Sequence, residues 1–273
     1  MNIYDQMVAE YQQQTSTSTP NVEQEVMEKI ALAGLCRGGF FKHAAFYGGT
    51  CLRLLHQLPR YSEDMDFTLK EKGSDVHLED FFPYIIEEFH LAGHEVVIQK
   101  KDKKIFGRVE SAFLKENTEI FDIKFQTKKN IKVKIEMDTD PPLGFETEDL
   151  PLSRPYPFVV CCVALPDLYA GKMHALLYRN WKTRVKGRDW YDFQWYVANR
   201  VPLNFAHLQQ RIREFNGEDI TKERFMEMLH EKLSTTNIES VKQDVRSFIF
   251  NPHELDIWSN DYFMRLADMM VLQ

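Results

Sequence analysis

The stretch FYGGTCLRLLHQLPRYSEDMDFTL, residues 46–69, predicts a strand, a tight turn, a helix and a second strand in close succession. A short apolar segment leads into the Gly48-Gly49-Thr50 turn, and a helical run follows from Cys51 to Gln57. A glycine turn directly before a helix lets backbone N–H groups approach a polyphosphate closely, and the helix N-terminus favours negative charge. The turn is therefore a candidate phosphate-binding site.

The second strand of this stretch carries two aspartates. Side chains two positions apart on a strand point the same way, so Asp64 and Asp66 face one side while Met65 and Phe67 enter the core. Two carboxylates held so close repel each other unless a cation lies between them, and hard oxygen ligands suit Mg²⁺. Either pattern alone is more often structural. Together, 16 positions apart from Gly48 to Asp64, they predict a site for phosphoryl or nucleotidyl transfer.

The rest of the chain predicts an α+β fold in two domains. Residues 1–157 read as an α+β half with several strands and an N-terminal helix from Asn21 to Leu35, and residues 158–273 as a helical C-terminal half packed on it. The expected strands are Ala44–Tyr47, Met65–Leu69, Glu95–Gln99, Ile105–Phe113, Phe121–Phe125 and Ile131–Met137, and 140–157 is expected to be a loop.

Composition limits the possible protein classes. At 273 residues, with 44% hydrophobic and 27% charged residues, the chain can bury a core without disulfides. No apolar run reaches the roughly 20 residues that a membrane span needs, and the polar N-terminus lacks the order of a signal peptide, so a cytoplasmic location is expected. The net charge of −7 argues against a nonspecific nucleic-acid coat but not against a local basic patch. Four cysteines without C-x-x-C spacing are expected to be reduced core thiols.

The motifs resemble those of one known family. G-G-T followed by R-x-S-x-D-x-D-F, here Arg60, Ser62, Asp64, Asp66 and Phe67, is similar to the nucleotidyltransferase superfamily and specifically to the AbiEii/AbiGii toxins of type IV toxin–antitoxin systems. That family also has a helical lysine and an R-D-x-x-D element. The counterparts in this sequence are Lys172 and Arg188-Asp189-Trp190-Tyr191-Asp192.

The resemblance implies a nucleotidyltransferase fold and a role for each matching residue. Gly48, Gly49 and Thr50 would hold the phosphates of a nucleoside triphosphate (NTP), Asp64 and Asp66 would bind Mg²⁺, and Arg60 and Ser62 would brace the strand or contact the triphosphate. Lys172 would face the triphosphate and Asp189 would position that lysine or a substrate group, a role that Asp192 could share.

A third carboxylate on a later strand completes the superfamily's site. Glu136, between Ile135 and Met137, fits this pattern best and is the expected third metal ligand and candidate general base. Asp138 lies on the same strand face, and Asp122 has a similar apolar context, so both remain alternatives.

A basic run in the helical half bears on which molecule accepts the transferred nucleotide. A basic run with interleaved aromatic residues suits phosphate contacts and base stacking, although a solvated surface with aromatics packing the bundle is the plainer interpretation. The run consists of Lys172, Arg179, Lys182, Arg184, Lys186 and Arg188 with Tyr178, Trp181, Trp190 and Tyr191. A lysine cluster at residues 100–104 reads as a strand-end turn.

Resemblance to relatives that modify tRNA implies an RNA acceptor, with the 3′ end of tRNA expected, and a cognate antitoxin protein as partner. Two other functions stay open at this point. One is a transferase that acts on a small molecule or a protein hydroxyl, and the other is a non-enzymatic module that binds nucleotides or RNA.

Overall fold

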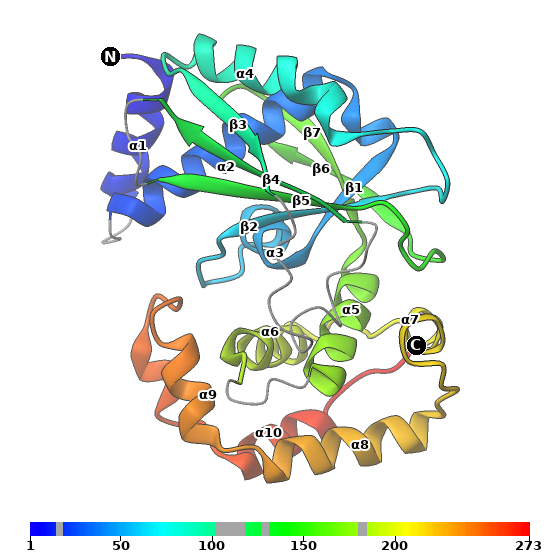
Figure 1. Ribbon diagram of the computed structural model, residues 1–273. Helices are drawn as coiled ribbons and strands as arrows, with labels where there is room; N and C mark the ends of the chain where they lie inside the picture. The colour runs from blue at the N-terminus through cyan, green and yellow to red at the C-terminus, as the bar shows by residue number, and fades with distance from the viewer. Residues whose placement is uncertain (15–18, 102–117, 127–130, 180–184) are drawn as a thin grey trace.

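The protein has a seven-stranded mixed sheet with helices on both of its faces, and the larger group of helices lies below the sheet in Figure 1. The computed structural model describes residues 1–14, 19–101, 118–126, 131–179 and 185–273. The strands are β1 (Ala44–Tyr47), β2 (Asp64–Leu69), β3 (Val96–Lys100), β4 (Thr118–Phe125), β5 (Lys132–Asp138), β6 (Thr147–Leu152) and β7 (Phe158–Val163).

The order of the strands in the sheet is β3-β4-β5-β2-β1-β7-β6. β2 pairs in parallel with β5, and β1 pairs in parallel with β7, while the other neighbours are antiparallel. Both strands of the glycine and aspartate stretch, β1 and β2, therefore lie in the middle of the sheet. The short helix α3 (Gly48–His56) connects them.

One face of the sheet forms the main core with α1 (Ile3–Gln14), α2 (Thr19–Arg37) and α4 (Phe82–Leu91). The alternation of β5 decides which face this is, because Val133, Ile135 and Met137 are fully buried while the intervening residues are not. Edge-to-face aromatic pairs join the layers, such as Phe82 with Phe121, whose ring centroids are 4.8 Å apart. The opposite face carries the charged residues of β2 and β5.

The charged face looks toward the helical half, which lies below the sheet in Figure 1. Its helices are α5 (Leu165–Tyr178), α6 (Gly187–Ala198), α7 (Phe205–Asn216), α8 (Lys222–Thr235), α9 (Ile238–Val245) and α10 (Asn260–Asp268). Pro166 lies in the first turn of α5, a position that tolerates the missing N–H, and Asn204 caps α7 by accepting a hydrogen bond from the His207 backbone.

The expected α+β class is confirmed, and three elements, β6, β7 and α1, were missed. Residues 140–157 were expected to be a loop, but β6 lies within them. It is an edge strand that contains Glu148, Asp149 and Pro151, and an edge tolerates both charge and proline because only one side must form ladder hydrogen bonds. The helix α1 has too narrow an apolar stripe to be recognised, since Tyr4 and Met7 alone are fully buried in it.

Two further expectations concern boundaries. The sheet continues through β7, so strand structure extends past residue 157, where the sheet half was expected to end. The strand expected at 105–113 lies outside the described residues. Within the described part of the chain, no helix is both long and apolar enough to cross a membrane.

Candidate active site

Three carboxylates meet where β2 and β5 run side by side. Asp64 and Asp66 lie on the charged face of β2, and Glu136 is the register partner of Asp66 on the parallel strand β5. Lys134, the partner of Asp64, places its Nζ 3.4 Å from Asp64 Oδ2 and also contacts Glu136 Oε1. The structure thus brings Asp64, Asp66 and Glu136 together around one ammonium group.

The two alternative third carboxylates lie elsewhere on the same face. Asp138 is in register with Thr68, two pairs beyond Asp66, and Asp122 is on β4 opposite Lys134. Asp122 is buried, and its carboxylate lies 3.0 Å from Lys101 Nζ and 3.6 Å from Lys132 Nζ. Of the three candidates, Glu136 is therefore the one in register with the aspartate pair.

The crowding of these carboxylates shows in their electrostatics. Burial raises the pKa of Asp66 to about 7, and the neighbouring charges of Glu136 and Asp64 act in the same direction. Burial would lower the pKa of Lys134, but Asp64 and Glu136 outweigh it and raise the value. The cluster therefore favours a cation among its oxygens.

The glycine turn lies directly against this cluster. Gly48 has φ +84°, a conformation that side chains disfavour, and a Cβ built on it would overlap Oδ2 of Asp66. A Cβ on Gly49 would come within 2.7 Å of Ser62 Oγ and 2.9 Å of an Arg60 nitrogen. The backbone at the start of α3 can approach the carboxylates only because both residues lack side chains.

Thr50 ties the glycine turn to the strand that carries the two aspartates. Its hydroxyl donates a 2.5 Å hydrogen bond to the backbone carbonyl of Asp64, and the residue is fully buried. The side chain of Thr50 thus braces β2, while its backbone N–H belongs to the N-terminus of α3.

Arg60 joins the sheet half to the helical half. Its Nε and Nη2 donate to the two carboxylate oxygens of Asp192 at 2.6 and 2.7 Å, and the residue is 1% exposed. A third donor, Nη1, bonds the carbonyl of Tyr61 at 2.8 Å. Of the two roles expected for Arg60, the structure supports bracing, because these contacts direct the guanidinium at Asp192.

We expect Arg60→Met to destabilise the fold by about 3 kcal/mol, because removing one partner of a buried pair leaves the other charge inadequately compensated. Urea unfolding of the variant measures this loss, and Arg60→Met combined with Asp192→Leu should recover part of it. An Arg60→Met variant of unchanged stability and a raised KM for NTP would instead make Arg60 a triphosphate ligand.

Lys172 and Asp189 also meet as the motifs predict. The Nζ of Lys172, on α5, lies 2.6 Å from Asp192 Oδ2 and 3.4 Å from Asp189 Oδ1, both on α6. Arg179 Nη1 approaches Asp189 Oδ2 at 3.2 Å. Burial would raise the pKa of Asp189, but Arg179, Lys172 and Lys186 outweigh it and hold the value well below the usual range. Asp189 and Asp192 therefore position a group of cations.

Lys186 belongs to the same group. Burial, followed by the charges of nearby cations with Arg179 the largest, lowers the pKa of Lys186 to about 8. Its charge also acts on Asp66, where it partly offsets the rise in pKa that burial and the neighbouring carboxylates cause. Lys186 is thus the link between the cations of the helical half and the carboxylates of the sheet.

Sequence reasoning missed Arg211, on α7. Burial lowers the pKa of its guanidinium, and its Nε is buried without a hydrogen-bond partner among the described residues. The charges that act on it include Tyr47, Asp138 and Arg179, so it lies beside both the sheet and the cation group. Nothing in the local sequence QQRIREF distinguishes it, because only the packing of α7 against α5 brings it there.

The expected RNA-binding run divides into different environments. Trp190 and Tyr191 are each 2% exposed and pack inside the helical half, as the plainer interpretation of these aromatics predicts, so they are not available to stack on bases. Arg188 lies over the Phe248 ring at 4.1 Å and pairs with Glu63 at 3.2 Å. Lys182, Arg184 and Trp181 lie outside the described residues.

Solved structures share this architecture. One is JHP933 from Helicobacter pylori, 15% identical, with a TM-score of 0.55 over 92% of this chain and 90% of that one. The description of a second H. pylori structure gives it an inferred nucleotidyltransferase activity. This structure is 15% identical, with a TM-score of 0.52 over 93% of this chain and 95% of its own. At such identities the likeness shows the fold. No curated protein matches the chain in sequence.

The sequence model of one family covers nearly the whole chain. That family is described as the nucleotidyl transferase AbiEii toxin of type IV toxin–antitoxin systems, and its model matches residues 30–272. The match includes β1, β2 and β5 with their carboxylates and α5 to α7 with their cations. The chain therefore belongs to the AbiEii family of nucleotidyl transferase toxins, whose systems pair each toxin with an antitoxin.

Proposed function

We propose that this toxin transfers a nucleoside monophosphate from an NTP to an RNA, with the 3′ end of tRNA as the expected acceptor, and releases pyrophosphate in a Mg²⁺-dependent reaction. The observation that carries the proposal is the pairing of two opposite sets of charges. Asp64, Asp66 and Glu136 gather on the sheet, Lys172, Arg179 and Lys186 gather around Asp189 in the helical half, and the charge of Lys186 acts on Asp66. The cytoplasm would supply both substrates.

The residues present fit Mg²⁺. All donors of the cluster are carboxylate oxygens, which hard divalent ions prefer, and Gly48 leaves the space beside Asp66 Oδ2 that any side chain would fill. The ammonium of Lys134 already lies between two of the carboxylates. Bound to Asp64, Asp66 and Glu136, Mg²⁺ would activate the attacking hydroxyl and stabilise charge on the departing pyrophosphate.

The chain's own groups would bind and orient the triphosphate. The start of α3 lies beside Asp66, so its free N–H groups would donate to phosphate oxygens bound there. Lys172, Arg179 and Lys186 would neutralise the phosphates, and Asp189 and Asp192 keep two of these cations in place. Glu136 is the proposed general base for the acceptor hydroxyl.

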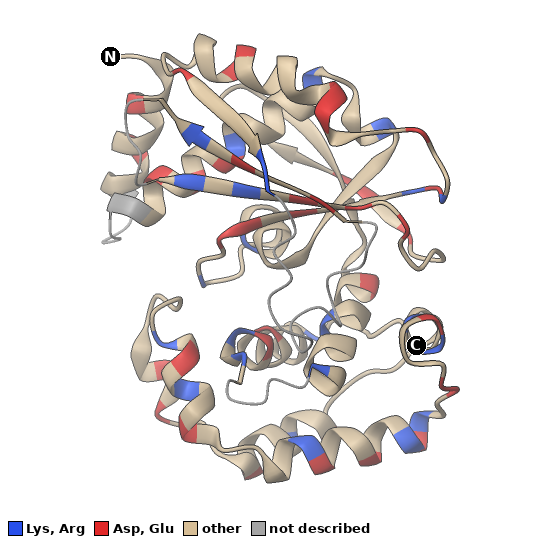
Figure 2. Ribbon diagram, in the orientation of Figure 1, with Lys and Arg blue, Asp and Glu red and all other residues tan. Residues whose placement is uncertain are grey.

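A lysine face beside the carboxylates supports RNA as the acceptor. We use this name for Lys101, Lys124 and Lys132, which surround the buried Asp122 on the charged side of β3, β4 and β5. Asp122, Lys134 and Asp64 occupy one register row across β4, β5 and β2, so the lysine face adjoins the active site. Figure 2 shows basic residues at the end of β4 and the beginning of β5, and acidic residues farther along β5 and on β2.

Three lysines around one aspartate leave a surplus of positive charge, and their side chains are 35–53% exposed. An exposed group of ammonium ions next to the reacting groups is suited to the phosphates of a polynucleotide. A small-molecule acceptor would not need it.

We expect Lys124→Gln with Lys132→Gln to weaken RNA binding and to lower the slope of log K against log salt by about one to two units. Filter binding of labelled tRNA at several salt concentrations measures both. Lys222→Gln, which removes an exposed lysine from α8, is the matched control and should leave the slope unchanged.

The transfer itself is tested by incubating the protein with each α-labelled NTP, Mg²⁺ and total RNA. Label in a tRNA-sized band is the expected result. Label on small molecules or on protein alone would contradict the RNA acceptor, and the absence of any labelled product with all four NTPs would contradict the transferase.

A further inference from the structure

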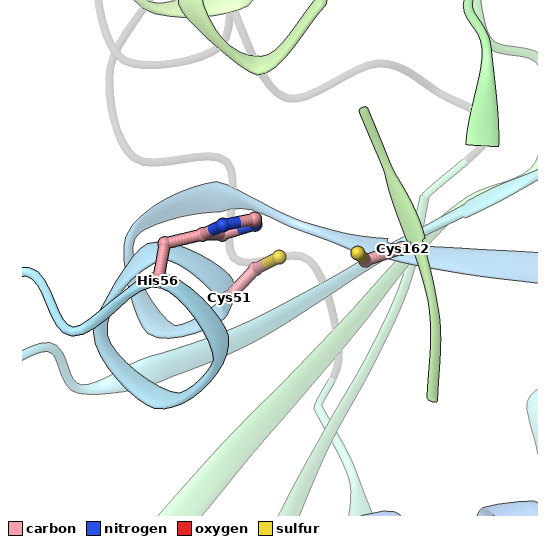
Figure 3. Close-up of side chains that lie close together, drawn as sticks. All are labelled: Cys51, His56 and Cys162. Carbon is pink, nitrogen blue, oxygen red and sulfur yellow. The ribbon is translucent and has the colours of Figure 1, made fainter. Parts of the chain in front are cut away.

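A cluster of two thiols and an imidazole lies between α3 and β7. Cys51 is in α3, His56 is the last residue of the same helix, and Cys162 is on β7 (Figure 3). One ligand atom from each residue lies within 4.8 Å of the other two. Cys51 and Cys162 are both fully buried. Two residues of α3 and one of β7 thus share one small volume.

One ring nitrogen of His56 has no hydrogen-bond partner in the described part of the chain. Its side chain is 9% exposed, and its Nε2 is buried with no hydrogen-bond partner among the described residues. Leaving such a group unsatisfied costs about 1–3 kcal/mol. A carboxylate oxygen, Glu148 Oε1 on β6, lies 3.9 Å from His56 Nε2. This distance is too long for a hydrogen bond, but it would allow both atoms to bind the same metal ion.

We propose that Cys51, His56 and Cys162 bind a Zn²⁺ ion, with Glu148 as the fourth ligand. Bond lengths of about 2.3 Å to sulfur and about 2.0 Å to nitrogen place tetrahedral ligand atoms roughly 3.5–3.8 Å apart. The three clustered atoms would therefore draw closer on binding, and Glu148, which lies near His56 but outside the cluster, would turn toward the ion. Thiolate and imidazole together select zinc over Mg²⁺, which prefers oxygen. Binding would displace the thiol protons of both cysteines to solvent.

The ion would fix the helix that carries the glycine turn. Cys51 lies three residues after Gly48, and Cys162 is in register with Phe46 on β1. Zinc would therefore tie α3 to β7 and, through Glu148, to the edge strand β6. This role is independent of the transfer reaction, so the proposal does not depend on the function proposed above.

Metal analysis of the full chain, purified without chelators or a histidine tag, tests the site. We expect about one zinc per chain in the wild type and a more than tenfold loss in Cys51→Ser and Cys162→Ser. Cys161→Ser is the matched control, because Cys161 is the buried neighbour of Cys162 on β7 but lies outside the cluster, and it should retain the metal.

Cobalt substitution keeps the test valid if a serine variant does not fold. Co²⁺ added to the metal-free wild type should give the visible bands of a tetrahedral site with sulfur charge transfer, and Glu148→Gln should weaken its binding. Metal-free protein that binds neither Zn²⁺ nor Co²⁺ would overturn the proposal. Equal zinc in Cys162→Ser and wild type, or an intact mass about 2 Da lower from a Cys51–Cys162 disulfide, would also overturn it.

Discussion

Asp66→Asn should reduce nucleotidyl transfer by about 10³-fold or more while leaving the fold intact. Asp66 lies between Asp64 and Glu136 in the carboxylate cluster, and its Oδ2 is the atom nearest the position of a Cβ on Gly48. Asparagine keeps the shape but removes the charge that holds a divalent cation. Initial rates of label transfer at saturating NTP and Mg²⁺ measure the loss.

Stability should respond in the opposite direction to activity. The pKa of Asp66 is raised from its model-compound value of 3.8 to about 7 in the fold, so ionising it costs the folded state stability as pH rises between these two values. Asp66→Asn removes this cost. Thermal unfolding of the metal-free variant at pH 8 should therefore show a Tm equal to or above that of the wild type.

An exposed aspartate provides the control for Asp66. Asp149→Asn changes the same chemical group on the edge strand β6 and should retain full activity. If Asp66→Asn were active, Asp66 could not be a required metal ligand. If the variant were inactive and also unfolded, the loss of activity would be explained by a folding defect.

Gly48→Ala should reduce activity by about 10²-fold or more, because the new methyl group would occupy the space of the Asp66 carboxylate. Alanine at φ +84° also strains the backbone, at a cost of about 1 kcal/mol. Transfer rates and urea unfolding of the same preparation separate the two effects.

Gly73→Ala isolates the backbone term. Gly73 has φ +73°, close to that of Gly48, but a Cβ there would meet no atom within 4 Å. The two variants should lose similar stability, and Gly48→Ala alone should lose activity. Equal activity in both variants would show that the turn does not need to approach Asp66.

Local patterns in the sequence predicted the elements that carry the site, since alternation and glycine placement act over a few residues. Asp64 and Asp66 share a strand face, and the half of the chain that was expected to be helical contains α5 and α6. The choice of Glu136 over Asp138 and Asp122 could only be ranked, because it depends on the register between β2 and β5, which is set by strands far apart in sequence.

Features that depend on packing between distant segments could not be predicted. Arg211 reaches the cation group only through the position of α7, and Cys162 reaches Cys51 only because β7 inserts beside β1. The burial of Trp190 and Tyr191 agrees with the plainer of the two sequence interpretations, although only the packed helices decide between them. The net charge of −7 was equally uninformative, because it averages the carboxylate cluster with the cations that face it.

Parallel reactions with α-labelled and γ-labelled NTP test nucleotidyl transfer by the carboxylate centre most directly. Wild-type protein with Mg²⁺ and tRNA should place the α-label, and not the γ-label, in the RNA, with pyrophosphate as the second product. Asp66→Asn and chelation of Mg²⁺ should each abolish this transfer. Incorporation of the γ-label, or undiminished transfer of the α-label by Asp66→Asn, would contradict the assignment.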